Sequence, residues 1–158
     1  MVELIQSNIV KKLPVSKLTD FMGEFNYIHS MLDDIKDTPY DPSMALIRQL
    51  VTEYIIFPLG SKLVRERLPE HVRSFLFYGP PGGGKSQVVR AIVSETKSVL
   101  FDMSPINLAG GEAAKFPGKE CEKLIAMVFI VAKAFEPSII YIDEAEKVWP
   151  AKKKKKKG

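Results

Sequence analysis

The sequence predicts an α/β fold in which helices flank a parallel β-sheet, and three observations support this fold class. A short apolar run at residues 75–78 leads into a glycine-rich stretch and then a helix start. A second short apolar run, at residues 139–142, ends in two consecutive acidic residues. The chain between these features has room for one helix, one strand and a second helix, which is the alternating order that a parallel sheet requires.

Two helices are expected upstream of the first apolar run. Apolar residues at helical spacing begin at Leu18, and the turn at residues 38–42 ends this helix because its two prolines cannot both lie inside one. Ser43 then caps a second helix, which has one apolar face and ends before Pro58. The stripe of the first helix comprises Leu18, Phe21, Met22, Phe25, Ile28 and Leu32.

Residues 79–86 match the pattern G-x-x-x-x-G-K-[ST], which binds the phosphates of nucleoside triphosphates. A glycine turn that only connects a strand to a helix is disfavoured, because the whole pattern and its strand, loop and helix context are present. Glycines can adopt positive φ and turn successive backbone N–H groups toward a phosphate chain. The residues expected to bind ATP are Gly79, Pro80, Pro81, Gly82, Gly83, Gly84, Lys85, Ser86 and Gln87.

Two side chains of this loop are expected to bind the charged parts of Mg-ATP, one the phosphates and the other the metal ion. Lys85 would reach the β and γ phosphates as a positive charge on a flexible stem. The hydroxyl of Ser86 would ligate Mg²⁺, which prefers oxygen ligands and usually keeps several waters. The helix that begins near Lys85 points the positive end of its dipole at the same place, which favours a bound phosphate.

After this helix, the apolar residues 99–101 predict a second strand, and a longer apolar stripe predicts a third long helix. The stripe comprises Cys121, Leu124, Ile125, Val128 and Ala132. On such a stripe, Cys121 is expected to be a small core residue rather than a nucleophile.

The third strand, residues 139–142, is expected to carry acidic catalytic groups at its carboxyl end. Asp143 would hold Mg²⁺ directly or through water, and Glu144 would orient and deprotonate the water that attacks the terminal phosphate. The alternative is a buried strand that runs into an acidic, solvated helix start. The phosphate-binding pattern in the same chain favours the catalytic interpretation.

Residues 76–86 and 139–144 together resemble the first half of an AAA ATPase module, with Gly83 and Ser86 standing where this family commonly has threonine. The shorter segments at 59–61, 101–105, 115–119 and 144–149 are similar to the IQ-motif-and-AAA-domain proteins of the dynein regulatory complex of ciliary axonemes. The resemblance implies a P-loop NTPase of AAA type that binds Mg-ATP and hydrolyses ATP. It also implies other AAA subunits or axonemal proteins as partners, and a location in the cytoplasm or the axoneme of a cilium.

The resemblance implies an organisation in three parts: a helical N-terminal segment at 1–38, a partial AAA ATPase domain at 43–150, and a lysine-rich disordered tail at 151–158. An AAA module continues through two more strands, an arginine finger and a helical lid, so we expect a sheet truncated after the third strand. Such a chain would be a fragment, a short gene product, or one that a partner completes. The alternative function is a nucleotide-binding scaffold without catalysis.

For two parts of the chain, the sequence allows both a structural and a functional interpretation. Phe116 lies where AAA modules often carry an aromatic residue facing a central pore, and a packing aromatic is the alternative. Residues 1–35 are expected to pack into the fold, and the alternative is a helical arm that docks on a partner.

Composition restricts the remaining function classes. The longest apolar run, at 124–132, is too short to span a bilayer, and the N-terminus lacks the layout of a signal peptide, so no membrane partner is expected. The single cysteine excludes an internal disulfide and suits a reducing cytosol. His29 and His71 have no second ligand at zinc-binding spacing.

The net charge of +4 depends on the lysine run at residues 152–157, without which the chain is slightly acidic. We expect this run to be a solvated tail, or else the start of a basic insertion, a nuclear address or a contact with an anionic surface. Nucleic acid is disfavoured as a partner because no aromatic residues interleave with the lysines.

Overall fold

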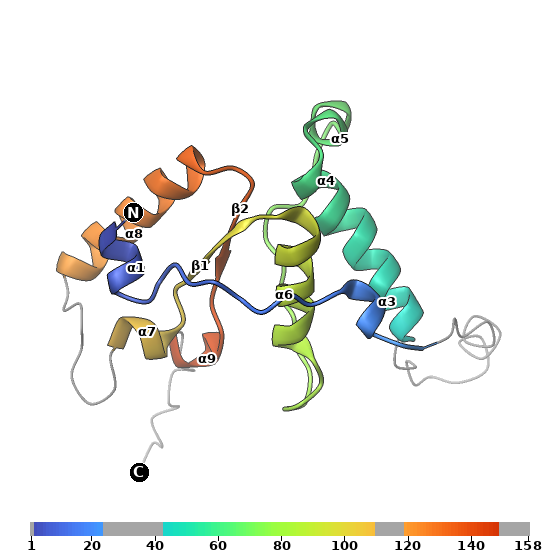
Figure 1. Ribbon diagram of the computed structural model, residues 1–158, viewed down its shortest axis with the longest axis horizontal. Coiled ribbons are helices and arrows are strands. Elements are labelled where there is room, and N and C mark those ends of the chain that lie inside the picture. The colour runs from blue at the N-terminus through green and yellow to red at the C-terminus, as the bar shows by residue number, and fades with distance from the viewer. Residues whose placement is uncertain (1, 24–42, 110–118, 149–158) are drawn as a thin grey trace, which may run out of the picture. The chain divides into compact units, whose positions relative to one another are not determined.

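The computed structural model describes residues 2–23, 43–109 and 119–148 of the chain (Figure 1). The chain forms two compact units. Residues 1–12 and 98–158 make up the first, here named the strand unit, and residues 13–97 make up the second, named the loop unit. Phe116, Trp149, His29 and the lysine run at 152–157 lie outside the described residues.

The strand unit contains a two-stranded parallel sheet, formed by β1 (Val99–Asp102) and β2 (Ser138–Tyr141) (Figure 1). In its register Val99 lies opposite Ser138 and Asp102 lies opposite Tyr141. The helices α7 (Pro105–Ala109) and α8 (Lys119–Ala134) belong to the connection between the strands, and α9 (Ala145–Val148) follows β2. The predicted α/β class, with a parallel sheet and flanking helices, is therefore confirmed.

The core of the strand unit forms between the sheet and one face of α8, which contacts both strands. Leu124, Val128 and Ala132 recur every four residues and are buried, as the predicted stripe requires. Ile125 is a member of the same predicted stripe, but 39% of its surface is exposed. The inward face of α8 is thus narrower than the sequence pattern indicated.

The N-terminal segment of the strand unit completes this core and covers part of one sheet edge. After α1 (Val2–Gln6), Val10 forms an antiparallel bridge with Phe101 of β1. The backbone N–H of Asp102 donates to the carbonyl of Ile9 over 2.7 Å. Leu4 and Ile9 are fully buried. These contacts occupy backbone groups of an edge strand that would otherwise stay unpaired.

In the loop unit, Ser43 caps α3 (Met44–Val51) as predicted, because its Oγ accepts a hydrogen bond from the backbone N–H of Leu46. The predicted end of this helix before Pro58 is wrong. The helical path continues through a π-helical turn, η2 (Thr52–Ile56), into α4 (Phe57–Gly60). Pro58 has no N–H to donate, and the π turn changes the hydrogen-bond register just before it, so the chain stays helical.

The loop unit continues with α5 (Lys62–Arg67) and α6 (Lys85–Thr96). Residues 75–78, predicted as a strand, form no strand, and Leu76 and Tyr78 are 78% and 89% exposed. A strand exists only through hydrogen bonds to a neighbour. In the described ranges β1 and β2 pair with one another, and no ladder includes residues 75–78. The apolar pattern alone was therefore not enough to form the predicted strand.

The predicted first helix is also wrong for the residues that the structure describes. Only one 3₁₀ turn, η1 (Leu18–Asp20), forms there, and residues 21–23 are not helical. The backbone N–H groups of Ser16 and Leu18 donate to the side chains of Ser94 and Glu95 on α6. These hydrogen bonds attach the segment to α6, with Leu18 at the start of the single 3₁₀ turn. The rest of the predicted stripe lies in the range that is not described.

None of the helices in the described ranges combines the length and the apolar character needed to cross a bilayer.

Candidate nucleotide-binding site

The glycine-rich loop at residues 79–86 contains three glycines with positive φ, and Gly83 is not among them. Gly79, Gly82 and Gly84 have φ of +150°, +78° and +81°, values that side chains disfavour. A β-carbon added at Gly82 would meet nothing within 4 Å, so this position needs glycine for its backbone angle and not for lack of space. The N–H of Gly83 donates to the carbonyl of Pro80 over 3.3 Å and forms a tight turn.

Lys85 begins α6 and folds back over the loop that precedes it. Its Nζ donates to the carbonyl oxygens of Gly79 and Pro80 over 2.9 and 2.8 Å. Gly84 is the N-cap of the helix in a left-handed conformation and, as a glycine, has no side chain that could cap the first N–H groups of α6. A loop that closes around an ammonium group and ends at an uncapped helix N-terminus can bind an anion. Ser86 follows directly and is half-buried in the first turn of α6.

A contact at Gly84, where this loop meets α6, was not predicted from the sequence. Phe21 is buried, and a β-carbon on Gly84 would stand 3.2 Å from its Cε1. The guanidinium of Arg48 donates to the carbonyls of Phe21 and Gly23, the latter over 2.9 Å. Phe21 was interpreted as part of a helical stripe, and no local signal marks it as a neighbour of the loop.

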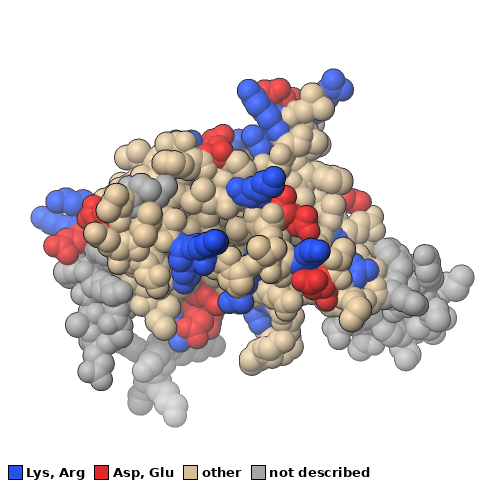
Figure 2. Space-filling view, in the orientation of Figure 1, with Lys and Arg blue, Asp and Glu red and all other residues tan. Residues whose placement is uncertain are grey.

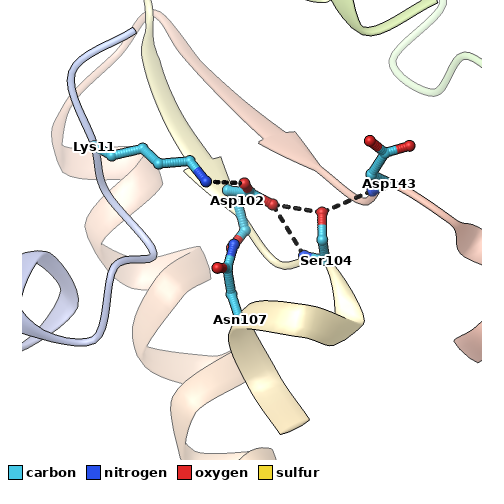
Figure 3. Close-up of polar contacts among 5 residues, drawn as sticks. All are labelled: Lys11, Asp102, Ser104, Asn107 and Asp143. Atoms are coloured by element: carbon cyan, nitrogen blue, oxygen red, sulfur yellow. Dashed lines mark hydrogen bonds and ion pairs between the residues drawn. The ribbon is translucent and has the colours of Figure 1, made fainter. Parts of the chain in front are cut away.

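In the strand unit, the predicted acidic pair follows β2 after one intervening residue, Ile142. The backbone N–H of Asp143 donates to the Oγ of Ser104 over 2.8 Å (Figure 3). The Oδ1 of Asp143 accepts from the N–H of Glu144 over 3.0 Å. Both the backbone and the side chain of Asp143 are therefore restrained at the carboxyl end of the strand.

Asp102, at the end of β1, organises the polar contacts around Asp143 (Figure 3). Its Oδ2 lies 2.5 Å from the Nζ of Lys11, and its Oδ1 accepts from the N–H and the Oγ of Ser104 over 3.1 and 2.5 Å. Burial alone would raise the pKa of Asp102, but the hydrogen bonds from Lys11 and Ser104 and the charge of Lys11 outweigh it, so this pKa is lowered. Asn107 donates to the Asp102 carbonyl.

This network was not predicted from the sequence. Its only local signal was a charged residue at the end of an apolar strand, because Lys11 lies far from Asp102 in the chain. The contact follows from the N-terminal segment that lies along β1.

Glu144, the expected catalytic base, has an unusual backbone conformation. Its φ of +50° is left-handed, which costs a residue with a β-carbon about 1–2 kcal/mol. Its carboxylate lies 2.5 Å from the Nζ of Lys147 in an ion pair of which both partners are about half exposed. Backbone strain of this kind gathers at functional sites, and an exposed ion pair adds little stability.

Lys85 and Ser86 belong to the loop unit, and Asp143 and Glu144 belong to the strand unit. Within the described ranges, no three His, Cys, Asp or Glu side chains gather as a ready-made metal site. On the face shown in Figure 2, Lys and Arg side chains are interspersed with Asp and Glu. Mixed charge of this kind differs from the continuous basic surface that proteins use to bind nucleic acid.

A glycine-rich loop with this pattern at the start of a helix, together with a parallel strand that is followed by Asp-Glu, is typical of the class of P-loop nucleotide-binding proteins. Residues 75–158 match the ATPase family associated with various cellular activities (AAA). The chain belongs to the AAA family and carries a module of its nucleotide-binding type, as the resemblance implied.

Curated relatives agree with this family. Dynein regulatory complex protein 11 of Mus musculus is 39% identical over 148 residues, which cover 93% of this chain and 17% of that protein. Spastin of Gallus gallus is 30% identical over 146 residues, which cover 92% of this chain and 20% of that protein. Protein SAP1 of Saccharomyces cerevisiae is 36% identical over 96 residues, which cover 61% of this chain and 10% of that protein. The chain thus spans a fifth or less of the length of these relatives.

Proposed function

We propose that this chain binds Mg-ATP through the loop at residues 79–86 and, within a complete AAA module or oligomer, hydrolyses ATP to ADP and phosphate. The observation that carries the proposal is the conformation of the loop. Positive φ at Gly82 and Gly84 and the uncapped start of α6 provide backbone N–H donors beside the ammonium group of Lys85. This is the set of donors that a triphosphate needs.

Each predicted site residue has a role in this proposal. Lys85 exchanges its two carbonyl acceptors for the β and γ phosphates. Ser86 and Asp143 offer a hydroxyl and a carboxylate oxygen, the donor chemistry that suits Mg²⁺. A bound Mg²⁺ neutralises the charge that develops on the phosphates. Glu144 orients the attacking water and accepts its proton.

Nucleotide binding is tested by titrating a fluorescent ATP analogue with Mg²⁺ into the purified chain. Lys85→Ala is expected to weaken binding by at least about tenfold, the value of one charge-assisted hydrogen bond or more. Lys62→Ala is the matched control, because Lys62 lies on α5 in an exposed ion pair with Glu66. Equal binding by the wild type and Lys85→Ala, with both folded, would contradict the proposal.

Hydrolysis is tested separately by phosphate release from the chain within an assembled AAA oligomer. Glu144→Gln keeps the size of the side chain and removes the base, so turnover is expected to be lost while binding of the fluorescent analogue stays intact. Unchanged turnover in Glu144→Gln would show that another group activates the water.

A second candidate function is a scaffold without catalysis inside a ciliary axonemal complex, with axonemal proteins as partners. The similarity to dynein regulatory complex protein 11 favours it. Under this proposal, tagged wild-type chain and Lys85→Ala would both reach the axoneme in ciliated cells, and Glu144→Gln would be indistinguishable from the wild type. A diffuse cytoplasmic signal from the wild-type chain would argue against the scaffold.

A further inference from the structure

A continuous chain of polar contacts leads from the N-terminal segment to the proposed metal ligand (Figure 3). Lys11 pairs with the Oδ2 of Asp102 over 2.5 Å, and the Oδ1 of Asp102 accepts from the hydroxyl of Ser104 over 2.5 Å. That same hydroxyl oxygen accepts from the backbone N–H of Asp143 over 2.8 Å. All four residues belong to the strand unit.

The direction of each hydrogen bond in this chain is determined by chemistry. An ionised carboxylate only accepts, so the hydroxyl proton of Ser104 must point at Asp102. The lone pairs of the hydroxyl then face the N–H of Asp143, which can only donate. The side chain of Asp102 is 9% exposed, and burying its negative charge without a partner would be costly. The positive charge of Lys11 compensates it. Removing Lys11 would therefore weaken the acceptor that orients Ser104.

We propose that Lys11, Asp102 and Ser104 are positioning residues that hold Asp143 in place for Mg²⁺, so that Lys11, which lies upstream of the matched AAA region, contributes to the metal affinity of the site. The inference rests on the proposed function, because it needs Asp143 to bind Mg²⁺. Removing a group that is hydrogen-bonded to a metal ligand and orients it typically weakens metal affinity by about 10–100-fold.

Lys11 is the best position for a test because other contacts keep its segment in place. Leu4 and Ile9 are fully buried, and the carbonyl of Ile9 accepts from the N–H of Asp102 over 2.7 Å. Lys11→Met retains an unbranched apolar side chain and removes the ammonium group, and with it both the charge and the hydrogen bond to Asp102. Lys12, the next residue, is exposed, so Lys12→Met is the matched control. Lys11→Arg restores the positive charge.

The experiment measures the Mg²⁺ concentration that gives half-maximal binding of a fluorescent ATP analogue. Lys11→Met is expected to raise this concentration about tenfold, with Lys11→Arg near the wild type and Lys12→Met unchanged. Affinity for the analogue in EDTA should be the same in all four proteins. A general loss of structure would lower that affinity too, so an unchanged value identifies a positioning effect. An unshifted Mg²⁺ requirement in folded Lys11→Met would overturn the inference.

A second measurement separates this inference from the proposed function. If the wild-type chain binds no Mg-nucleotide, the proposed function is wrong, and amide hydrogen exchange at Asp143 decides whether the contact chain holds this residue. The exchange should be slow in the wild type and in Lys12→Met, and faster in Lys11→Met and Ser104→Ala. Equal exchange rates in all four proteins would overturn the contact chain itself.

Discussion

The ring of Phe21 lies against Gly84, so that a β-carbon on Gly84 would stand 3.2 Å from the Cε1 of Phe21. Phe21 is only 7% exposed, and Arg48 holds its carbonyl. The phosphate-binding loop is therefore packed, where α6 begins, against a segment some sixty positions earlier in the sequence. Gly84 is needed both for its positive φ and for this close approach.

We expect Gly84→Ala to destabilise the loop unit more than Gly82→Ala. Both glycines have positive φ, which costs alanine about 1–2 kcal/mol, but only Gly84 also meets Phe21. Urea denaturation followed by circular dichroism measures the two free energies of unfolding. In a Phe21→Ala background the excess cost of Gly84→Ala should shrink, because the ring is no longer in the way. An equal cost for both substitutions would contradict this account.

Stability should fall in acid partly through Asp102. Its pKa in the folded chain is below the ordinary 3.8, so folding disfavours its protonation. The stabilisation is complete above the unfolded pKa and is lost as the pH falls through the lower, folded pKa. Between about pH 5 and pH 3, the melting temperature of the wild type should therefore drop more than that of Asp102→Asn, which cannot titrate at this site. Parallel pH profiles for the two proteins would count against the Lys11–Asp102 pair.

Val128→Ala should destabilise the strand unit by about 2 kcal/mol, because it removes buried methyl groups and leaves a cavity. Val128 is fully buried against the core, whereas Ile130 on the same helix is 69% exposed. Ile130→Ala should change the free energy of unfolding by less than about 0.5 kcal/mol. Chemical denaturation of both variants measures the difference, and similar values would show that α8 is oriented differently.

Lys97→Gly is expected to stabilise the loop unit by up to about 1 kcal/mol. Lys97 is the C-cap of α6 with a φ of +53°, a left-handed position that glycine adopts without steric cost. The side chain is exposed, so little packing is lost. Thermal melting compares this variant with Lys97→Ala, which keeps the strain and should not be stabilised. A melting temperature of Lys97→Gly below that of the wild type would contradict this prediction.

Much of the fold could be predicted because its signals are local. Both described strands, α6 and α8 lie where apolar periodicity predicts them, and Ser43 caps α3 through its own hydroxyl. The turn of the glycine-rich loop was predictable for the same reason, since Gly82 and Gly84, which have positive φ, both lie within the eight-residue pattern. The pair Asp143 and Glu144 also follows its strand as expected.

The wrong predictions concern backbone hydrogen bonding that the local apolar pattern does not specify. Residues 75–78 have the composition of a strand, but a strand also needs a neighbour, and composition does not supply one. At Leu18 only one 3₁₀ turn forms although the apolar spacing predicts a helix, and Pro58 is tolerated because a π turn precedes it. Local propensity is a weak preference that tertiary contacts override.

The sequence by itself determined the family, the loop with its lysine and hydroxyl, the helices α3, α6 and α8, and the acidic pair after β2, because each depends on residues within a few positions of one another. Only the tertiary structure decided that Phe21 packs on Gly84 and that Lys11 reaches Asp143 through Asp102 and Ser104. These contacts join segments far apart in the chain, and the free energy that selects them comes from burial and hydrogen bonding after the chain has folded, which no local pattern records.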